Sequence, residues 1–440
     1  MSKHKYSKSL LAAAAGMLLA GQSHGAAFEL KEKSAKAQGR ATAGSISAPG
    51  DASAIAENPA AMRGLDGRVF QADLTTVDYS VKFNGAGEDA LGRPLSGNNG
   101  GEAGATKPIP AMYFHTPLGE RTHLGLSLTA PFGFTTDYDP QWKGRYQGQK
   151  TELKAVNLGL SLSYDLNEQL SLGGSLFFEH ATANLTTALD FGAIMAASRV
   201  PGYAPTSADG RIALDGSDNA FGFTLGLLYS PTRQTHIGAA YRSGVNHKLS
   251  DASIQFDVPQ GPKAILAATR PGWFTDTNAS TELRMPSSWT LSVTHQLNER
   301  WTVMADVHRT KWSRFKDVVL DFDSPQATQA ISFDYRNTMF GALGAEYTLN
   351  PDLTLRAGVA YDQTPVRAAT RDVRVPDVDR KWLSLGATWR ASQSIEWSAG
   401  YTHLFLDDAG VAMRSATGST LHGNYKLASD ILAVSLAYRF

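Results

Sequence analysis

The sequence predicts an all-β protein, a 14-stranded antiparallel transmembrane β-barrel with an N-terminal lumenal plug, or hatch. Two observations carry this prediction: apolar and polar residues alternate along the chain, and short and long connections follow one another in a regular order. A third observation excludes a helical membrane protein. After the N-terminus, no run approaches the roughly 18 uninterrupted apolar residues of a transmembrane helix, whereas a barrel strand needs an apolar residue only at every second position.

Apolar residues recur at every second position in several segments. This period suits a strand with one apolar face and does not suit a helix. A soluble β-sandwich also alternates, but its strands usually run for about five or six residues. The stripes here run for about ten residues, the length of a tilted strand that crosses a bilayer, and several end in Tyr or Trp where an interfacial girdle would lie. They lie at 156–164, 221–229, 339–347, 353–361 and 432–440.

Short turns alternate with long segments between the predicted strands. The six short turns lie at 117–120, 167–168, 231–233, 298–300, 350–352 and 392–393. The seven long segments lie at about 84–107, 137–150, 189–217, 248–281, 317–331, 363–378 and 407–424. Short periplasmic turns and long extracellular loops are typical of outer-membrane barrels, and thirteen connections join fourteen strands.

The first 25 residues have the features of a secretory signal peptide. Lys3, Lys5 and Lys8 form a positive region, residues 10–20 form a short apolar core, and Ser23 and Gly25 are small residues at the positions that a signal peptidase reads. We expect cleavage after Gly25. Loss of the three lysines changes the formal charge of the chain from zero to −3.

Residues 26–66 do not alternate and are rich in Ala, Gly and Ser, whereas residues 67–440 carry the predicted strands. A disordered tail and a hatch folded into the lumen both fit this composition. A barrel of fourteen strands has room for a small plug, because it is wider than the side-chain-filled barrels of eight strands. Asn58-Pro59-Ala60 is a turn signal with one fixed backbone angle, and it favours the hatch.

Composition and missing motifs exclude several function classes. The chain has no cysteine, which rules out disulfides, thiolate metal sites and cysteine nucleophiles. A formal net charge of zero gives no general attraction to nucleic acid. The eleven histidines show no metal-ligand spacing, and no nucleophile elbow or phosphate-binding loop is present. We therefore expect no catalytic residue, metal or cofactor, and an outer-membrane lipase or protease is the enzyme alternative.

The chain resembles the FadL-type outer-membrane transporters of long-chain fatty acids and their relatives for aromatic hydrocarbons. The resemblance covers essentially the whole mature chain and rests on the order of short motifs. These are 26–30 at the mature start with Phe28, 39–41 and 58–60 in the hatch, 241–243, 285–286 with Trp289, 312–315, 365–366 and 376–384. It implies a fourteen-stranded barrel with a hatch, a groove between extracellular loops, an inner pocket, and a side exit at a kink in the third strand.

The residues support the groove and the kink independently. Apolar residues cluster in two long loops that should be polar, which suggests a binding groove, although they also suit packing of the loops on one another. The groove candidates are Phe191, Ile194, Met195, Val200, Ile265, Leu266, Trp273 and Phe274. In the third strand, Ala130-Pro131-Phe132-Gly133 interrupts the alternation. Pro cannot donate a ladder bond and Gly favours a bulge, so we expect a lateral exit kink here rather than the end of the strand.

One departure from the family bears on the substrate. The resemblance implies basic residues that bind the ligand carboxylate, but the matching positions are Thr186 or Thr187 and Val319, none of which is basic. Arg242, Arg314 and Lys316 are the candidates that take their place. An unpaired carboxylate inside a barrel is costly, so aromatic hydrocarbons stay an alternative substrate class.

We therefore expect a passive transporter of hydrophobic molecules, foremost long-chain fatty acids, in the bacterial outer membrane. The alternative in a different class is a general aqueous porin, which would have an open polar lumen. The expected partners are a hydrophobic ligand, outer-membrane lipid and lipopolysaccharide, and the outer-membrane insertion machinery, with no nucleic acid. The chain is expected to be a monomer.

Overall fold

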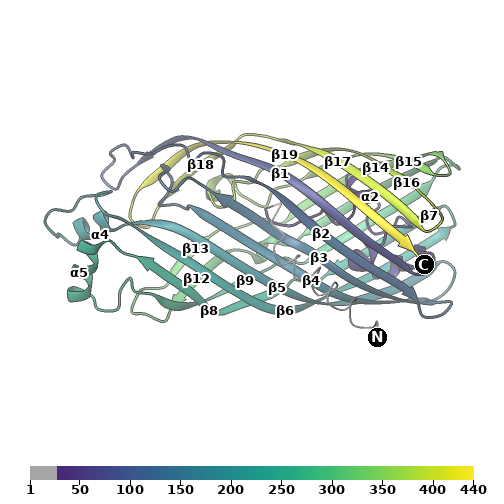
Figure 1. Cartoon of the computed structure of the whole chain (residues 1–440), viewed down its shortest axis with the longest axis horizontal. Coiled ribbons are helices and arrows are strands. Elements are labelled where there is room, and N and C mark those ends of the chain that lie inside the picture. The colour runs from purple at the N-terminus through teal and green to yellow at the C-terminus, as the bar shows by residue number, and fades with distance from the viewer. Residues whose placement is uncertain (1–26) are drawn as a thin grey trace, which may run out of the picture.

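The computed structural model describes residues 27–440, which form a single elongated barrel (Figure 1). The predicted signal peptide and its cleavage site lie outside the described residues. Among the helices in the described part of the chain, none has the length and apolar character to cross a membrane.

Nineteen strand segments make the barrel, and five of them continue the preceding segment across a short break. The result is a closed barrel of fourteen antiparallel strands, as the sequence predicts. The unbroken strands are β1 (Val69–Glu88), β2 (Ala105–Pro117), β3 (Thr122–Asp137), β4 (Lys150–Asp165), β5 (Leu170–Asp190), β6 (Asp209–Thr232), β15 (Leu353–Asp362), β16 (Arg380–Arg390) and β19 (Thr420–Arg439). The broken strands are β7 (Thr235–Arg242) with β8 (Asn246–Asp257), β9 (Thr277–Arg284) with β10 (Ser288–Gln296), β11 (Trp301–Thr310) with β12 (Asp317–Phe322), β13 (Gln329–Ser332) with β14 (Thr338–Asn350), and β17 (Ile395–Leu406) with β18 (Ala409–Arg414).

The first and last strands close the barrel. β1 and β19 pair over their whole length, from Val69 opposite Arg439 to Glu88 opposite Thr420. Closure pairs the outer edges of the first and last strands, which matters in a bilayer because each unpaired backbone group there costs several kcal/mol.

Side chains near the short-turn end follow the pattern of a barrel in lipid, not that of a soluble sandwich. On β4, Leu158, Leu160 and Leu162 are each more than half exposed on the outer face, while Ser161 and Ser163 are buried inside. Such a row of exposed leucines needs an apolar solvent around it.

The alternation reverses as the strands leave this apolar belt. On the inner face of β1, Gln71 and Asp73 give way to Val81 and Phe83, all of them buried, while Lys82 points outward. Outside the bilayer the barrel stands in water and needs an apolar core of its own. The strands therefore run on into segments that the sequence predicted as loops, including 84–88, 209–217, 248–257 and 317–322.

All six predicted short turns join strands at one end, and the seven longer connections lie at the other end (Figure 1). Several long connections are shorter than predicted because of the strand extensions. They carry the helices α4 (Phe191–Ala197) and α5 (Gln260–Thr269) and the 3-10 turn η3 (Ala368–Thr370), while η2 (Trp312–Arg314) fills the break between β11 and β12.

Residues 27–65 lie inside the barrel, where Figure 1 shows α2 behind the strands. They form α2 (Ala35–Gln38), α3 (Ala54–Glu57) and η1 (Pro59–Gly64). Polar side chains on the inner wall hold this segment: Asp73 accepts a hydrogen bond from the Ala35 amide at 2.9 Å, and Asp306 accepts one from the Gly44 amide at 2.6 Å. The polar inner face of the strands is therefore the surface that binds the N-terminal segment.

Candidate functional site

An apolar cavity of about 60 Å³ lies inside the barrel, toward the long-loop end of the strands. Side chains from the N-terminal segment, from the barrel wall and from the connection between β15 and β16 surround it. The one charged residue in the lining, Glu152, is ion-paired with Lys154. The lining consists of Phe28, Phe134, Thr151, Glu152, Leu153, Ala183, Leu185, Leu283, Phe315, Val318, Ile331, Phe333 and Val375. Such a cavity suits an apolar ligand group.

Phe28 separates this cavity from the rest of the lumen. Its side chain is 2% exposed, and its ring centroid lies 4.6 Å from that of Trp312, 5.0 Å from Phe315 and 6.0 Å from Phe132. The neighbouring Ala27 amide donates a hydrogen bond to the Asp377 carboxylate at 2.8 Å. The start of the described chain is thus fixed inside an aromatic cluster.

The barrel wall is open on one side of β3. β2 and β3 pair only from Pro117 opposite His123 to Met112 opposite Leu128. Beyond that point the β3–β4 register shifts between Thr129 and Phe132, where the sequence predicted a kink. The residues of β3 from Thr129 onward have no ladder partner on β2 among the described residues.

The N-terminal segment takes up hydrogen bonds that the kink leaves free. The Leu30 amide donates to the Pro131 carbonyl at 2.8 Å, and the Gly133 amide donates to the Phe28 carbonyl at 2.9 Å. Phe28 and its neighbours therefore act as a short extra strand along the kink, facing the lumen rather than lipid.

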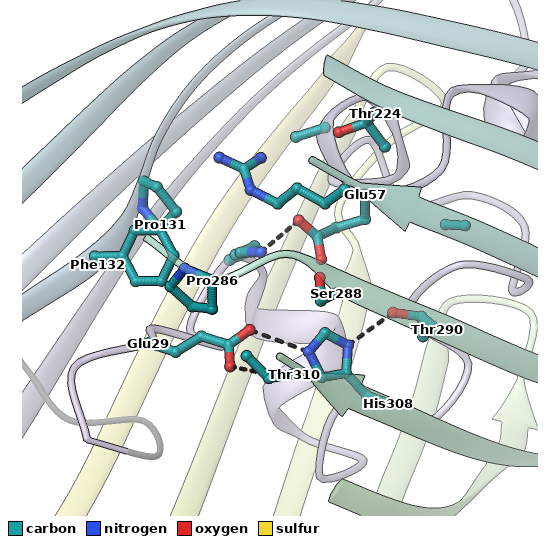
Figure 2. Close-up of a pocket in the computed structure, with 14 residues that line it drawn as sticks. Glu29, Glu57, Pro131, Phe132, Thr224, Pro286, Ser288, Thr290, His308 and Thr310 are labelled. Carbon is teal, nitrogen blue, oxygen red and sulfur yellow. Dashed lines mark hydrogen bonds and ion pairs between the residues drawn. The ribbon is translucent and has the colours of Figure 1, made fainter. Parts of the chain in front are cut away.

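A polar pocket of about 20 Å³ lies next to the kink on the lumen side (Figure 2). Pro131 and Phe132 form one wall, and Glu29 and His308 face them. The His308 ring lies between Glu29, 3.1 Å away through Nε2, and the Thr290 hydroxyl, 2.7 Å away through Nδ1. Phe28 and Phe132 thus stand between an apolar cavity and a charged pocket.

The described residues contain no group of three or more His, Asp or Glu side chains placed to hold a metal ion.

The charges around this pocket set the ionisation of the N-terminal carboxyls. Burial opposes ionisation of Glu29, but Lys31 and then His308 outweigh it and hold the pKa of Glu29 far below its ordinary value. Glu57 is partly buried, which opposes ionisation, but Lys33, at 2.5 Å, outweighs this and lowers the pKa of Glu57. For Glu32 burial dominates and raises the pKa to about 7, because backbone amides and Arg380 offset it only in part.

The sequence of this chain matches a known protein family. The family described as outer membrane protein transport protein (OMPP1/FadL/TodX) matches residues 16–440 of this chain. The chain belongs to the OMPP1/FadL/TodX family of outer-membrane transport proteins. The long-chain fatty acid transport protein of Escherichia coli O6:H1 is 29% identical over 424 residues, covering 91% of this chain and 92% of that protein. Outer membrane protein P1 of Haemophilus influenzae is 31% identical, covering 91% of this chain and 90% of that protein.

Solved structures of the family agree with the fold. A FadL homologue from Pseudomonas aeruginosa superposes with a TM-score of 0.88 at 30% identity, covering 94% of this chain and 100% of that one. The toluene transporter TodX of P. putida gives a TM-score of 0.67 at 20% identity, covering 94% and 99%, and supports the fold alone. The chain is thus an outer-membrane β-barrel, with its short turns toward the periplasm and its long loops outside.

The eight predicted groove residues of this FadL-family barrel come together, but as a packed cluster rather than an open groove. Phe191 and Met195 on α4 and Leu266 on α5 are each less than 5% exposed, and Ile194, Val200, Ile265 and Phe274 pack around them, partly buried. Trp273 lies at the edge, beside Phe274 and under the Arg270 guanidinium. In this conformation the loops pack on one another, and ligand binding there stays a prediction.

The three predicted carboxylate partners do not line the apolar cavity. Arg242 lies beside the polar pocket, 3.3 Å from Glu179 and stacked on the Phe177 ring at 3.9 Å. Arg314 donates to the Met285 carbonyl and the Asn246 side chain at 3.3 and 2.7 Å. Lys316 is exposed.

Sequence reasoning missed Arg374, which lies close to the position of the missing family arginine. It comes from the connection between β15 and β16, and its guanidinium donates to the Thr187 hydroxyl at 3.2 Å and to Asp372 at 2.9 Å. Its Nε is buried without a hydrogen-bond partner, and the next residue, Val375, lines the cavity. Nothing local in the sequence marks this arginine, because Thr187 is far away along the chain.

The predicted hatch residues lie at a close contact with the wall. Asn58 is fully buried, and its amide donates to the carbonyls of Ile46 at 2.9 Å and Leu227 at 3.1 Å. Pro59 opens η1, and Ala60 is buried beside it. A Cβ on Gly226 would lie 1.9 Å from the Asn58 side-chain oxygen, so this approach requires glycine in the wall.

Proposed function

We propose that this chain takes up long-chain fatty acids across the outer membrane without an energy source. The apolar cavity that borders the open side of β3, with Phe28 between them, carries this proposal. Relatives about 29% identical over nine-tenths of the chain are named long-chain fatty acid transport proteins, which supports the same class of ligand here.

The proposed route has three stages. The ligand is captured at the α4–α5 cluster, moves into the apolar cavity, and leaves sideways between β2 and β3 at the kink formed by residues 130–133. Residues 27–66 act as the hatch, which blocks the straight path to the periplasm. The cavity must widen for this, because ligand sites usually measure about 300–1,000 Å³. We expect Phe28 to be the wall residue that moves, since two backbone hydrogen bonds join its segment to β3.

We propose that Arg374 binds the carboxylate of the fatty acid. Its Nε is a buried donor without a partner, and a carboxylate whose tail lies along Val375 and Leu185 would supply the missing acceptor. A hydrogen bond between charged groups contributes about 1.5–3 kcal/mol, which corresponds to roughly ten- to a hundredfold in affinity.

Uptake of aromatic hydrocarbons is the second candidate. It is favoured by the absence of any basic side chain among the residues that line the cavity. A neutral ligand would need none, and Arg374 is already paired with Asp372. An aqueous porin is disfavoured, because the hatch fills the lumen with buried side chains.

We propose three further partners. The belt of exposed leucines contacts outer-membrane lipid, and the outward charges beyond it face lipopolysaccharide. Phe440, 72% exposed, ends the last strand where the insertion machinery would bind it. We propose that the barrel works as a monomer and has no catalytic role.

The test is uptake of labelled oleate and labelled toluene by a strain that lacks its own transporters. Arg374→Gln is compared with Arg367→Gln, an arginine of the same connection that is half exposed. A fatty acid transporter loses oleate uptake in Arg374→Gln only. Toluene uptake without oleate uptake in the unmodified protein would establish the hydrocarbon alternative, and a large steady conductance in planar bilayers would establish the porin.

A further inference from the structure

The barrel wall has a second interruption, between β6 and β8. β6 pairs with β7 from Thr232 back to Thr224 and with β8 from Asp215 to Arg211. Within the described chain, no ladder pair joins residues 216–222 to the facing strand. Phe223 ends the lower ladder, exchanging bonds of 2.9 Å with Ser243. We call the stretch 216–222, with the facing residues 244–250, the β6–β8 seam.

The seam lies at the outer edge of the membrane. Phe221 precedes the lower aromatic Tyr229 by eight residues along β6, and both rings point outward, 76% and 41% exposed. At about 3.3 Å per residue and a tilt of about 40°, Phe221 stands roughly 20 Å above Tyr229, within an apolar band about 25 Å tall. The seam therefore begins in the outer leaflet and ends among its headgroups.

A chain of hydrogen-bonded polar side chains replaces the missing ladder. His247 on β8 is fully buried; its Nε2 lies 3.0 Å from Glu179 on β5 and its Nδ1 lies 3.2 Å from Asp218 on β6. Asp218 also accepts the Lys248 amide at 3.0 Å, and Arg242 pairs with Glu179. These groups, here named the His247 latch, join three strands through side chains where backbone pairing is absent.

Gly216, Ala220 and Gly222 in the seam are small, and apolar side chains close it from within. A Cβ on Gly216 would lie 2.6 Å from Leu249, and one on Gly222 would lie 2.3 Å from the Phe177 ring. Leu249 and Phe177 belong to the same buried cluster as Phe28 and Phe132. The gap between β9 and β12 differs, because fully buried Trp312 fills it and Arg314 ties it to Met285.

We propose that the β6–β8 seam is a second lateral opening, through which an apolar ligand passes between the lumen and the outer leaflet, and that the His247 latch holds it shut. This inference rests on the proposed transport of hydrophobic molecules. Separation of β6 from β8 there breaks no ladder bond, so only the latch and the contacts of Leu249 resist it. Elsewhere along β6 the same separation would break a continuous ladder.

The first experiment measures opening directly and needs no transport. The chain has no cysteine, so Leu249→Cys introduces a single thiol, at a position 1% exposed behind the seam. A lipid-soluble maleimide is added to the variant in liposomes, with and without His247→Asn. Loss of the His247 hydrogen bonds leaves a buried acceptor of Glu179 unpaired and should raise the labelling rate roughly tenfold or more. Equal labelling rates in two variants that both migrate as folded barrels would overturn the latch.

The second experiment leaves the latch intact and locks the seam. Ser217 and Ser250 are exposed, and the continued register of Asp215 with Ser253 places Ser217 opposite Asp251, the neighbour of Ser250. Ser217→Cys with Ser250→Cys is closed by a short bifunctional maleimide. The matched control is Ala412→Cys with His422→Cys, an exposed pair in an intact ladder. We expect several-fold loss of oleate or toluene uptake in the seam pair only.

Equal uptake before and after crosslinking of the seam pair would overturn the second opening. If the uncrosslinked barrel transports neither probe, the proposed function fails, while the labelling rate of the Leu249→Cys variant still decides whether the seam opens.

Discussion

Replacement of Phe28 by Ala tests whether the aromatic contacts of the hatch keep the side opening closed. Phe28 is 2% exposed and touches three aromatic rings. Loss of a buried Phe side chain costs about 3–5 kcal/mol. If that loss falls on the docked state of residues 27–30, the population of the detached state rises between roughly a hundredfold and a few thousandfold. The segment then leaves the kink without unfolding the barrel.

Hydrogen exchange followed by mass spectrometry measures this population. The Leu30 and Gly133 amides donate across the junction of hatch and kink, so both should exchange faster in Phe28→Ala by the factor above. Amides of the β16–β17 ladder should not change. Phe405→Ala is the matched control, since that ring is 52% exposed on the outer face. Unchanged protection of Leu30 and Gly133 in Phe28→Ala would refute the idea that Phe28 holds the segment.

Three further predictions address the exit, the hatch and assembly. Replacement of Pro131 by Thr and Gly133 by Val should restore a straight strand and strongly lower uptake of oleate and toluene at equal surface level, leaving only passage through the β6–β8 seam; undiminished uptake would exclude an exit at the kink. Deletion of 26–60 should admit small hydrophilic antibiotics while the barrel still folds, because it removes Asn58 and its two bonds to the hatch and wall; unchanged antibiotic sensitivity would show that the segment does not block the lumen. Deletion of Phe440, whose amide donates to the Arg68 carbonyl at 3.1 Å, should lower the yield of heat-modifiable folded barrel in the outer membrane, and a normal yield would argue against its role in insertion.

The barrel was predictable because its determinants repeat along the chain. Leu158, Leu160 and Leu162 signal a lipid face through spacing alone, and each short turn has a local signature. The strand extensions escaped prediction because the apolar face moves from outside to inside where the barrel leaves the bilayer. On β1 this change falls between Asp73 and Val81. A pattern fitted to the lipid face ends there, although the strand continues.

The site was predictable only where a single residue forces the backbone. Pro131 cannot donate to a ladder, and the register does shift beside it. The partners that fill the kink could not be foreseen, since Phe28 and Gly133 are about a hundred residues apart and meet only because the barrel closes. The same holds for Arg374 with Thr187 and for His247 with Glu179. Charged side chains in this lumen pair with residues that are distant in the sequence. The order of the strands therefore does not predict which charged side chain is left without an ion-pair partner.

The buried carboxyl of Glu32 makes docking of the hatch depend on pH, with a sign that can be worked out. Burial raises its pKa from 4.5 to about 7 in the folded protein. Between these values the docked hatch holds a proton that a solvated glutamate has lost, so docking is strongest below about pH 4.5 and weakens as the pH rises to about 7. A shift of this size is worth about 3 kcal/mol at most. Glu29 and Glu57 have lowered pKa values, so their ionised forms stabilise the docked hatch. This stabilisation is complete above about pH 4.5 and is lost as the pH falls below that value.

Glu32→Gln removes the titrating group and keeps the shape of the side chain. We expect protection of the hatch amides, corrected for intrinsic exchange, to fall between pH 5 and pH 8 in the unmodified protein and to fall less steeply in Glu32→Gln. At pH 8 the variant hatch should be the better protected of the two, because no buried carboxyl has to lose its proton. Glu120→Gln, in an exposed turn, is the control and should keep the original slope. An equal slope in Glu32→Gln would mean that another group sets the pH response, and the hatch would then be held by its hydrogen bonds to Asp73 and Asp306 irrespective of the ionisation of Glu32.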